Sequence, residues 1–399
     1  MDKAEYLKLR SMPVPQLALL LSARGEADAG FLLRQAEGWQ RLRGKVPSWA
    51  AADGLLYPPR LALEQCSGEE AARYKAGVAQ RLLAGETEAA LTDLTGGMGV
   101  DFSFIARHFA RAVYVERQEE LCRTARHNFP ILGLGHAEVV CADAVKHLAE
   151  MPPAHIIYID PARRDTAGRK TVRISDCEPD ILALRDLLLA KAREAVMVKL
   201  SPMLDITEAV RELGCVAEAH VVASGGECKD LLLVLKKDAD SQPVLFAAED
   251  GRVFRFAAGE EVAAVAPLAD GVGAYLYEPC AAVMKAGAFK LAATRYGLEK
   301  LHPNSHLYTA ACAVGGFPGR AFAVTGVYGF AKKDINALRR DTPQANIATR
   351  NFPLGAEALR KKLRLRDGGG VYLFATTLRD GRHALIRCEK CAVPRPCGD

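Results

Sequence analysis

A glycine-rich segment in the second quarter of the chain is the part of the sequence best suited to hold a ligand. It reads Leu91-Thr-Asp-Leu-Thr-Gly-Gly-Met-Gly-Val-Asp101 and lies between an apolar run expected to form a strand and a run expected to form a helix. Glycines let a ligand approach the backbone closely, and the N-terminus of a helix offers free amides to a carboxylate. The sequence therefore predicts a small-molecule site at the carboxyl end of this strand.

The same glycines do not complete the fingerprint of a dinucleotide-binding loop. That fingerprint requires a third glycine three positions after the second one. After Gly97 and Gly99, the corresponding position is Phe102. The pattern of an ordinary dinucleotide-dependent dehydrogenase is therefore broken.

Acidic residues follow the next two expected strands. Glu116 ends the run Val113-Tyr-Val-Glu, and Asp143 follows Val139-Val-Cys-Ala. At these positions Glu116 can accept hydrogen bonds from both hydroxyls of a ribose, and Asp143 from the amino group of an adenine. Burying such acceptors without donors is costly, so the three acids in register, Asp93, Glu116 and Asp143, favour ligand contact over solvated loop positions. This arrangement is typical of S-adenosylmethionine-dependent methyltransferases, and the candidate cofactor-binding residues are Asp93, Thr95, Gly96, Gly97, Gly99, Asp101, Glu116, Asp143 and Ala144.

The fourth expected strand ends in a motif that carries the candidate catalytic residues, Asp160 and Pro161. The run His155-Ile-Ile-Tyr-Ile-Asp-Pro-Ala-Arg-Arg164 resembles the Asp-Pro-Pro-aromatic motif of enzymes that methylate exocyclic amino groups of bases. In that motif the acid and the next carbonyl accept hydrogen bonds from the amine and direct its lone pair toward the methyl group. Ala162 and Arg163 replace the second proline and the stacking aromatic. The motif therefore does not decide which atom is methylated. A purely structural turn at Asp160 is the alternative.

A basic loop follows this motif and supplies two of the three candidate substrate-binding residues, Arg163 and Arg164. Basic residues continue as far as Arg173. A basic loop at the mouth of a pocket can clamp phosphates, although ion pairs with the neighbouring acids explain it equally well. The third candidate is Lys199, which leaves the fifth expected strand at the same edge of the sheet. Cys177 and Cys228 lack the Pro-Cys context of a methylation nucleophile, so buried or bystander thiols are the favoured interpretation.

Short β-type runs alternate with helical runs between residues 91 and 235, which predicts an α/β fold with a doubly wound sheet. Only Ala223–Asp230 separates the last two strands, too little for a helical crossover, so these strands should be antiparallel. Such a Rossmann-like, seven-stranded sheet is that of class I methyltransferases. The expected strands are Leu91–Thr95, Ala112–Glu116, Glu138–Cys141, His155–Asp160, Ala195–Leu200, Val216–Val222 and Leu231–Leu235, and the expected helices are Phe102–Phe109, Glu119–Phe129, Ala144–Ala149, Ile181–Arg193 and Ile206–Leu213.

A chain of 399 residues is too long for one small domain, and we expect four regions. Residues 1–84 form an N-terminal helical region, in which Ser67-Gly-Glu-Glu70 predicts a capping box. Residues 85–238 form the Rossmann-like domain, and residues 239–322 a linker and a small domain. Residues 323–399 form a basic α+β domain. The two last regions contain an expected strand at Val253–Phe256, expected helices at Cys280–Leu291 and Ala356–Leu365, and an expected hairpin over Val371–Cys388.

Charge is distributed unevenly along the chain. The net charge is +5, but residues 326–399 contain fifteen Lys or Arg against seven Asp or Glu, so the preceding part sums to −3. A basic C-terminal region suggests a polyanionic partner, with nucleic acid as the first candidate. The longest apolar runs are far shorter than a membrane span of ~20 residues, and the N-terminus has no secretory cleavage pattern. We therefore expect a cytoplasmic protein with no membrane contact.

The 11 cysteines are scattered, and reduced thiols are the expected state. The exception is the tail, where Cys388 and Cys391 form a C-x-x-C pair and Cys397 follows. Three such ligands could hold zinc if a fourth came from elsewhere. A strand end followed by a loose tail is the favoured interpretation, and no metal site is assigned.

Three segments together resemble those of bacterial class I methyltransferases with a C-terminal THUMP-like domain. They are Asp93-Leu-Thr-Gly-Gly-Met-Gly-Val-Asp101, Asp160-Pro-Ala-Arg-Arg-Asp165 and Glu278-Pro-Cys-Ala-Ala-Val-Met-Lys-Ala-Gly-Ala-Phe289. The resemblance covers nearly the whole chain. It implies a small ferredoxin-like unit near Pro279–Phe322 and the THUMP-like module near Val324–Glu389. THUMP domains are associated with tRNA and other RNA, which agrees with the basic C-terminal region.

The sequence thus predicts a methyltransferase whose cofactor is S-adenosyl-L-methionine and whose substrate is a base nitrogen of tRNA or rRNA. Two alternatives stay open. The missing aromatic after Asp160-Pro161 favours methylation of a small molecule or a protein. An RNA-binding protein without catalysis is the other alternative, and the intact set of acids and glycines argues against it.

Overall fold

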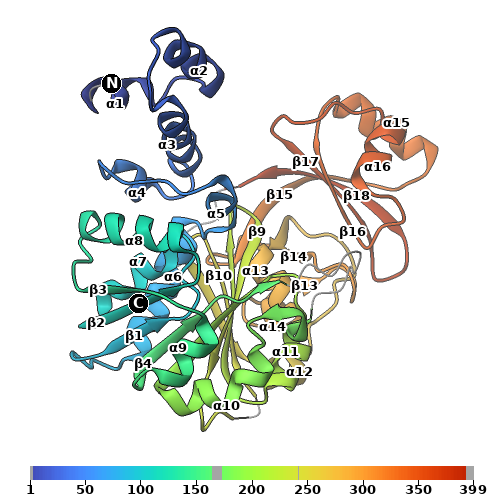
Figure 1. Ribbon diagram of the computed structural model, residues 1–399. Helices are drawn as coiled ribbons and strands as arrows, with labels where there is room; N and C mark the ends of the chain where they lie inside the picture. Colours follow the sequence, from blue (N-terminus) through green and yellow to red (C-terminus); the bar gives the residue numbers. More distant parts are fainter. Residues whose placement is uncertain (1–2, 164–172, 241, 392–399) are drawn as a thin grey trace. The chain divides into compact units, whose positions relative to one another are not determined.

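The computed structural model describes residues 3–163, 173–240 and 242–391, and the chain divides into two compact units. The first unit contains residues 1–224 and 229–243, and the second contains residues 225–228 and 244–399. Figure 1 shows the elements of both units. No helix among the described residues is long and apolar enough to cross a membrane.

The first unit begins with helices, as the sequence predicted. Helix α6 is the longest helix next to the sheet, and its buried face consists mainly of alanines, which lets it pack closely. The predicted capping box at its start is wrong, because Gly68 is the N-cap residue and no side chain caps the helix. The helices are α1 (Lys3–Leu9), α2 (Val14–Ala23), α3 (Ala29–Leu42), α4 (Pro47–Ala51), α5 (Arg60–Gln65) and α6 (Glu69–Leu82).

The sheet of the first unit has the predicted topology. The seven predicted strands are hydrogen-bonded in the order β8-β9-β7-β4-β1-β2-β3, although the sheet has nine strands in all and not the seven expected. Strands β1, β2, β3, β4 and β7 are mutually parallel, and β9 runs antiparallel to β7. The strands are β1 (Ala90–Asp93), β2 (Arg111–Glu116), β3 (Ala137–Cys141), β4 (Ala154–Ile159), β7 (Ala192–Leu200), β8 (Val216–Ser224) and β9 (Glu227–Leu235), and a separate two-stranded sheet pairs β5 (Ala162–Arg163) with β6 (Cys177–Glu178).

Helices cover both faces of this sheet, which explains why its central strands are apolar throughout. Helices α6, α7 and α8 lie on one side of the strands, and α9 and α10 lie on the other (Figure 1). The five helices predicted between strands are all present, with ends that differ by a few residues. They are α7 (Val100–Ile105), continued by the 3-10 turn Ala106–His108, α8 (Glu119–Ile131), α9 (Ala144–Glu150), α10 (Ile181–Lys191) and α11 (Ile206–Leu213).

The second unit contains a seven-stranded sheet in the order β13-β14-β12-β15-β18-β17-β16. Strands β17 and β18 form the predicted hairpin, whereas β16 and β17 are parallel. One face of the hairpin packs in a core around Phe322 and Phe374. The other face packs against helices α15 (Lys332–Asp341) and α16 (Ala356–Leu363) through Leu338 and Leu359. The strands are β12 (Tyr275–Pro279), β13 (Glu299–Lys300), β14 (Tyr308–Ala310), β15 (Gly319–Tyr328), β16 (Asn346–Arg350), β17 (Val371–Thr377) and β18 (His383–Lys390).

Two expectations for the second unit were incomplete. The strand expected near Val253 is β11 (Arg252–Ala257), but it pairs with a strand that the sequence did not reveal, β10 (Val244–Glu249). The single helix expected over Cys280–Leu291 is wrong, because Gly287 at φ +78° ends one helix before the next begins. The helices of this unit are α12 (Ala258–Ala263), α13 (Ala281–Ala286), α14 (Phe289–Thr294), α15 (Lys332–Asp341) and α16 (Ala356–Leu363).

Three aromatic rings join the glycine-rich segment to the core of the first unit. Phe102, Tyr114 and Phe129 are buried, and their ring centroids lie 5.0–5.5 Å from one another. They come from α7, β2 and α8, so they fix the first helix after the glycines against the neighbouring strand and helix. Burial of large side chains at this junction stabilises the first unit where the ligand site is expected.

We expect Phe129→Ala to destabilise the first unit by about 3–5 kcal/mol, because truncation leaves a cavity among these rings. Both tryptophans, Trp39 and Trp49, belong to the first unit, so their fluorescence during urea unfolding reports on that unit. Phe31→Ala is the matched control, because Phe31 is 43% exposed. This variant should lower the free energy of unfolding far less. Equal losses of unfolding free energy in the two variants would contradict the role assigned to the three aromatic rings.

Candidate functional site

A cleft of about 1230 Å³ opens at the carboxyl ends of β1, β2, β3, β4 and β7. Drug-sized ligands typically occupy roughly 300–1,000 Å³, so this cleft has room for more than one small molecule. The structure brings twelve of the predicted site residues together in its lining. They are Asp93, Thr95, Gly96, Gly97, Gly99, Asp101, Glu116, Asp143, Ala144, Asp160, Pro161 and Lys199.

Of the two remaining predicted residues, the structure describes only the backbone of Arg163. The backbone of Arg163 belongs to β5, which follows the cleft residues Pro161 and Ala162. Arg164 lies outside the described residues. Cys177, expected from the sequence to be a buried or bystander thiol, is buried and lines the cleft.

Close packing explains why the loop after β1 is rich in glycine. A Cβ atom on Gly96 would lie 2.1 Å from the ring of Tyr114, and Gly99 has φ +84°, a conformation that side-chain-bearing residues rarely adopt. The hydroxyl of Tyr114 donates a hydrogen bond to the carbonyl of Gly97. The loop therefore lies flat against β2, and its backbone lines the cleft directly.

Glu116 is held by the backbone around it. Its Oε2 accepts a hydrogen bond from Gly97 N at 2.9 Å, and its Oε1 accepts one from Gln118 N at 2.8 Å. These two bonds orient the carboxylate at the edge of the cleft. Because each carboxylate oxygen has a second lone pair, the side chain can still accept bonds from a ligand.

Asp143 has a structural role that the sequence analysis did not foresee. It is the N-cap residue of α9, and its Oδ1 accepts hydrogen bonds from Val145 N and Lys146 N at 2.9 and 3.0 Å. Such caps stabilise helices by about 1 kcal/mol. Oδ2 has no hydrogen-bond partner among the described residues, so capping and ligand contact are compatible at this position.

Thr95 connects the loop after β1 to the loop after β4. Its backbone amide donates to Oδ1 of Asp93 at 2.9 Å, and its hydroxyl accepts a hydrogen bond from Asp160 N at 2.6 Å. Burial raises the pKa of Asp93 well above its ordinary value, and the neighbouring carboxylates add to the effect. Asp93 is therefore a buried acceptor whose negative charge is costly without a donor from a ligand.

A buried network of charged side chains lies beneath the cleft. Lys75 of α6 is completely buried, and its ammonium group donates to Asp101 Oδ2 at 2.9 Å and to Asp230 Oδ2 at 2.7 Å. Asp101 Oδ2 also accepts hydrogen bonds from the hydroxyls of Ser67 and Tyr158, each at 2.8 Å. Burial raises the pKa of Asp101, but the ammonium groups of Lys75 and Lys199 outweigh burial and hold it below its ordinary value.

Lys199 connects this network to Asp160. Its ammonium group donates to Asp160 Oδ2 at 2.5 Å and lies 4.0 Å from Asp230 Oδ1. Burial raises the pKa of Asp160, although Lys199 opposes the shift. Burial alone would lower the pKa of Lys199, but the surrounding carboxylates, with Asp160 the strongest, raise it. The raised pKa of Lys199 keeps its ammonium group charged at neutral pH, and the contact fixes the position of the Asp160 side chain.

Sequence analysis missed Ser67, Lys75, Tyr158 and Asp230 as parts of this site. One signal was available, because Lys75 lies among Ala71, Ala72, Ala76 and Ala79 on the apolar face of α6. A lysine is almost never fully buried unless it is paired, so this position predicts a buried acid. The identity of the acids depends on tertiary contacts, since Asp230 is far from Lys75 in sequence and binds it across the fold.

The structure describes two of the three cysteines of the C-terminal tail. Cys388 is buried in β18, and Cys391 is half-buried. Cys397 lies outside the described residues.

Comparisons with known proteins extend this picture. The crystal structure of a methyltransferase from Porphyromonas gingivalis W83 matches with a TM-score of 0.83 and 37% sequence identity, covering 92% of this chain and 91% of that one. The chain belongs to the bacterial class I S-adenosylmethionine-dependent methyltransferases with a C-terminal THUMP-like domain. Uncharacterised S-adenosylmethionine-dependent methyltransferases from two strains of Mycobacterium tuberculosis are 26% identical over 339 residues, covering 84% of this chain and 88% of theirs.

Family models match the C-terminal part of this methyltransferase. A ferredoxin-like domain matches residues 275–318, and a THUMP-like domain matches residues 319–390. The cofactor of this methyltransferase is S-adenosyl-L-methionine. The residues of the cleft suit it, because they combine a glycine loop whose backbone lines the cleft with carboxylates at the ends of β2 and β3.

Lys75→Met should destabilise the first unit by about 3–5 kcal/mol, because Asp101 and Asp230 would lose their buried counter-ion. Tryptophan fluorescence during urea unfolding measures the effect. Arg60→Met removes an exposed cation that pairs with Glu64, and this control should leave the free energy of unfolding nearly unchanged. A Lys75→Met protein as stable as the control would show that the buried network is not needed for folding.

Asp93→Asn should change how the stability of the cofactor-free protein depends on pH. The folded-state pKa of Asp93 lies above the unfolded value of about 3.9, so protonated Asp93 stabilises the fold at low pH. That stabilisation is lost as the pH rises through the folded-state pKa. Asparagine cannot ionise, so the variant should lack this loss when Tm is measured from pH 4 to 8. Parallel curves of Tm against pH for Asp93→Asn and the unmodified protein would refute the expectation.

Proposed function

We propose that this methyltransferase modifies a nitrogen of a base in tRNA or rRNA. The observation that carries the proposal is Asp160-Pro161, which lines the cleft beside the cofactor-binding loop and whose carboxylate is held by Lys199. Lys199 engages Oδ2, so Oδ1 is the oxygen that can accept a hydrogen bond from the amine. Lys199 in this role positions Asp160, which differs from the direct substrate contact expected from the sequence.

The cofactor binds along the ends of the first three strands in this proposal. The backbone of Gly96, Gly97 and Gly99 faces its amino-acid part, and Asp93 and Thr95 shape that loop. Glu116 accepts the ribose hydroxyls, and Asp143 with Ala144 meets the adenine. Asp101 contributes to cofactor binding indirectly, because it anchors the start of α7 to Lys75.

Methyl transfer from a sulfonium is an in-line displacement, so the protein mainly has to align donor and acceptor. S-adenosyl-L-methionine supplies the methyl group and leaves as a neutral thioether. Asp160 Oδ1 and the carbonyl of Pro161 accept hydrogen bonds from the amine and turn its lone pair toward the cofactor. The amine loses one proton as the N–C bond forms, and Asp160 or water can receive it.

A basic surface on the THUMP-like domain supports RNA as the substrate. Helices α15 and α16 adjoin, because Arg339 of α15 donates to the carbonyls of Lys362 and Leu363 at the end of α16. Their exposed residues are largely cationic, and such a surface attracts the phosphates of RNA. Arg163 and Arg164 would contact further phosphates of the same RNA. The exposed cations of the two helices and the turn that follows are Lys332, Lys333, Arg340, Lys361, Lys362, Arg364 and Arg366.

Methylation of a small molecule or a protein is the second candidate. The observation in its favour is Ala162, which occupies the position where base-modifying enzymes carry part of their stacking platform and which is exposed. A base that enters this cleft would need another stacking partner.

Methyl incorporation from radiolabelled S-adenosylmethionine into total RNA tests both candidates. RNA from a strain that lacks the protein should become labelled in a tRNA or rRNA fraction. Asp160→Asn should lower the rate of methyl transfer by about 100-fold, because it loses the carboxylate that Lys199 positions. The variant should still bind the cofactor in calorimetry.

Lys361→Glu with Lys362→Glu should weaken RNA binding and reduce the dependence of that binding on salt.

Two outcomes would contradict the proposal in different ways. Cofactor binding without label in any RNA fraction would favour a small molecule or a protein as the substrate. Full activity of Asp160→Asn would show that the acceptor does not bind at Asp160.

A further inference from the structure

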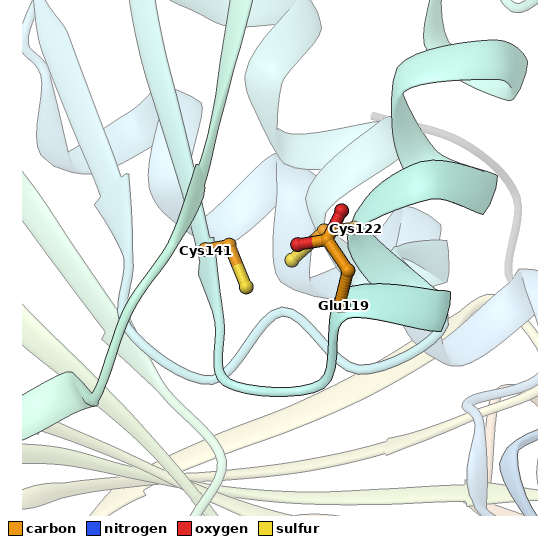
Figure 2. Close-up of side chains that lie close together, drawn as sticks. All are labelled: Glu119, Cys122 and Cys141. Carbon is orange, nitrogen blue, oxygen red and sulfur yellow. The ribbon is translucent and has the colours of Figure 1, made fainter.

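Three side chains that can bind a metal lie together outside the cleft's catalytic end. Glu119 and Cys122 come from the first turn of α8, and Cys141 is the last residue of β3 (Figure 2). One carboxylate oxygen and two sulfur atoms lie within 4.8 Å of one another. In the described part of the chain, no other three side chains of His, Cys, Asp or Glu meet this criterion.

The fold brings these residues together by rigid elements. Glu119 and Cys122 are three positions apart on a helix and therefore share a face. Strand β3 pairs with β2 in parallel, with Cys141 opposite Glu116, and α8 follows β2 directly. The sulfur of Cys141 thus meets the beginning of α8 without any contribution from a long loop. Sites on helices and strands hold ligand atoms more precisely than sites on loops.

The site is open to an ion from solvent on one side. Cys141 and Glu119 are exposed, whereas Cys122 is buried and its thiol donates to the carbonyl of Glu116 at 3.2 Å. Glu119 also pairs with Arg126 at 3.2 Å, but both side chains are about half exposed. An exposed pair of this kind contributes little to stability, so a metal can displace it.

We propose that Glu119, Cys122 and Cys141 bind a thiophilic divalent cation, with Zn²⁺ the best match and water as the fourth ligand. Two thiolates and one carboxylate are ligands that Zn²⁺ prefers. A tetrahedral zinc with bonds of about 2.1–2.3 Å holds its ligand atoms roughly 3.4–3.8 Å apart. The three side chains therefore need to draw together by only about 1 Å.

A bound ion would join two elements that flank the cofactor cleft. Glu119 is three residues after Glu116, and Cys141 is two residues before Asp143. The ion would hold the start of α8 against the end of β3, and with them the loops that carry both of these carboxylates. The site does not depend on the identity of the methyl acceptor, so it can be tested without knowledge of the substrate.

Titration of the reduced, full-length protein with Cd²⁺ tests the site, because Cd²⁺–thiolate bonds give a charge-transfer absorption in the ultraviolet. The measurement uses a protein with Cys391→Ser and Cys397→Ser, which removes ligands of the C-terminal tail. We expect one Cd²⁺ per chain, displaced by Zn²⁺. Cys141→Ser should abolish the absorption, and Glu119→Ala should weaken binding by at least about tenfold.

Two matched controls separate this site from general effects. Cys312→Ser removes another exposed thiol, and Glu120→Ala removes the neighbouring exposed acid; both should bind Cd²⁺ as before. Zn²⁺ at about 100 times its Kd should also raise Tm by on the order of 5 °C, in the parent but not in Cys141→Ser. Absence of stoichiometric binding, or binding that survives Cys141→Ser, would overturn the proposal. Because Cys141 is exposed, its substitution should leave the fold intact, and an unchanged Tm without metal verifies this.

Discussion

The buried contact between Lys75 and the carboxylates of Asp101 and Asp230 is the constraint on which the cofactor cleft depends. Burying an ammonium group costs several kcal/mol unless acceptors surround it, and here α6, α7 and β9 each supply part of that environment. The contact joins the N-terminal helical region to both the first strand–helix junction and the final antiparallel strand. Lys199 continues the network to Asp160, so the proposed catalytic carboxylate is positioned from the same buried cluster.

Around this cluster, Thr95, Asp143 and Glu116 each hold part of the protein backbone in place and also line the cleft. Thr95 orders the loop after β1, and its hydroxyl accepts a hydrogen bond from the backbone amide of Asp160. Asp143 caps α9 through Oδ1, while its Oδ2 has no hydrogen-bond partner among the described residues. Glu116 holds the glycine loop through Gly97 N. Such groups are already hydrogen-bonded before a ligand arrives, so little ordering is needed when the cofactor binds. The THUMP-like domain contributes a different property, a cationic surface on two adjoining helices.

Much of the fold and of the cleft could be predicted from the sequence, because the signals were local. Continuous apolar strands, the spacing of the helices and the short Ala223–Asp230 connection predicted the sheet and its antiparallel last strand, and the structure has both. Local patterns were less reliable where a single residue decides the outcome. Gly287 divides the expected helix after Cys280, and the predicted capping box at Ser67 is absent, because Ser67 instead donates to Asp101.

The sequence by itself therefore determined the family, its cofactor and the region of the chain that forms the cleft, since glycines and acids at strand ends follow one another in chain order. Only the tertiary structure decided which charged side chains pair with one another and which thiols lie together. Lys75 meets Asp230, Lys199 meets Asp160, and Cys122 meets Cys141 across elements that are separate in sequence. The physical reason is that a buried charge or thiol has no local pattern of its own, and its partner is set by how the layers pack.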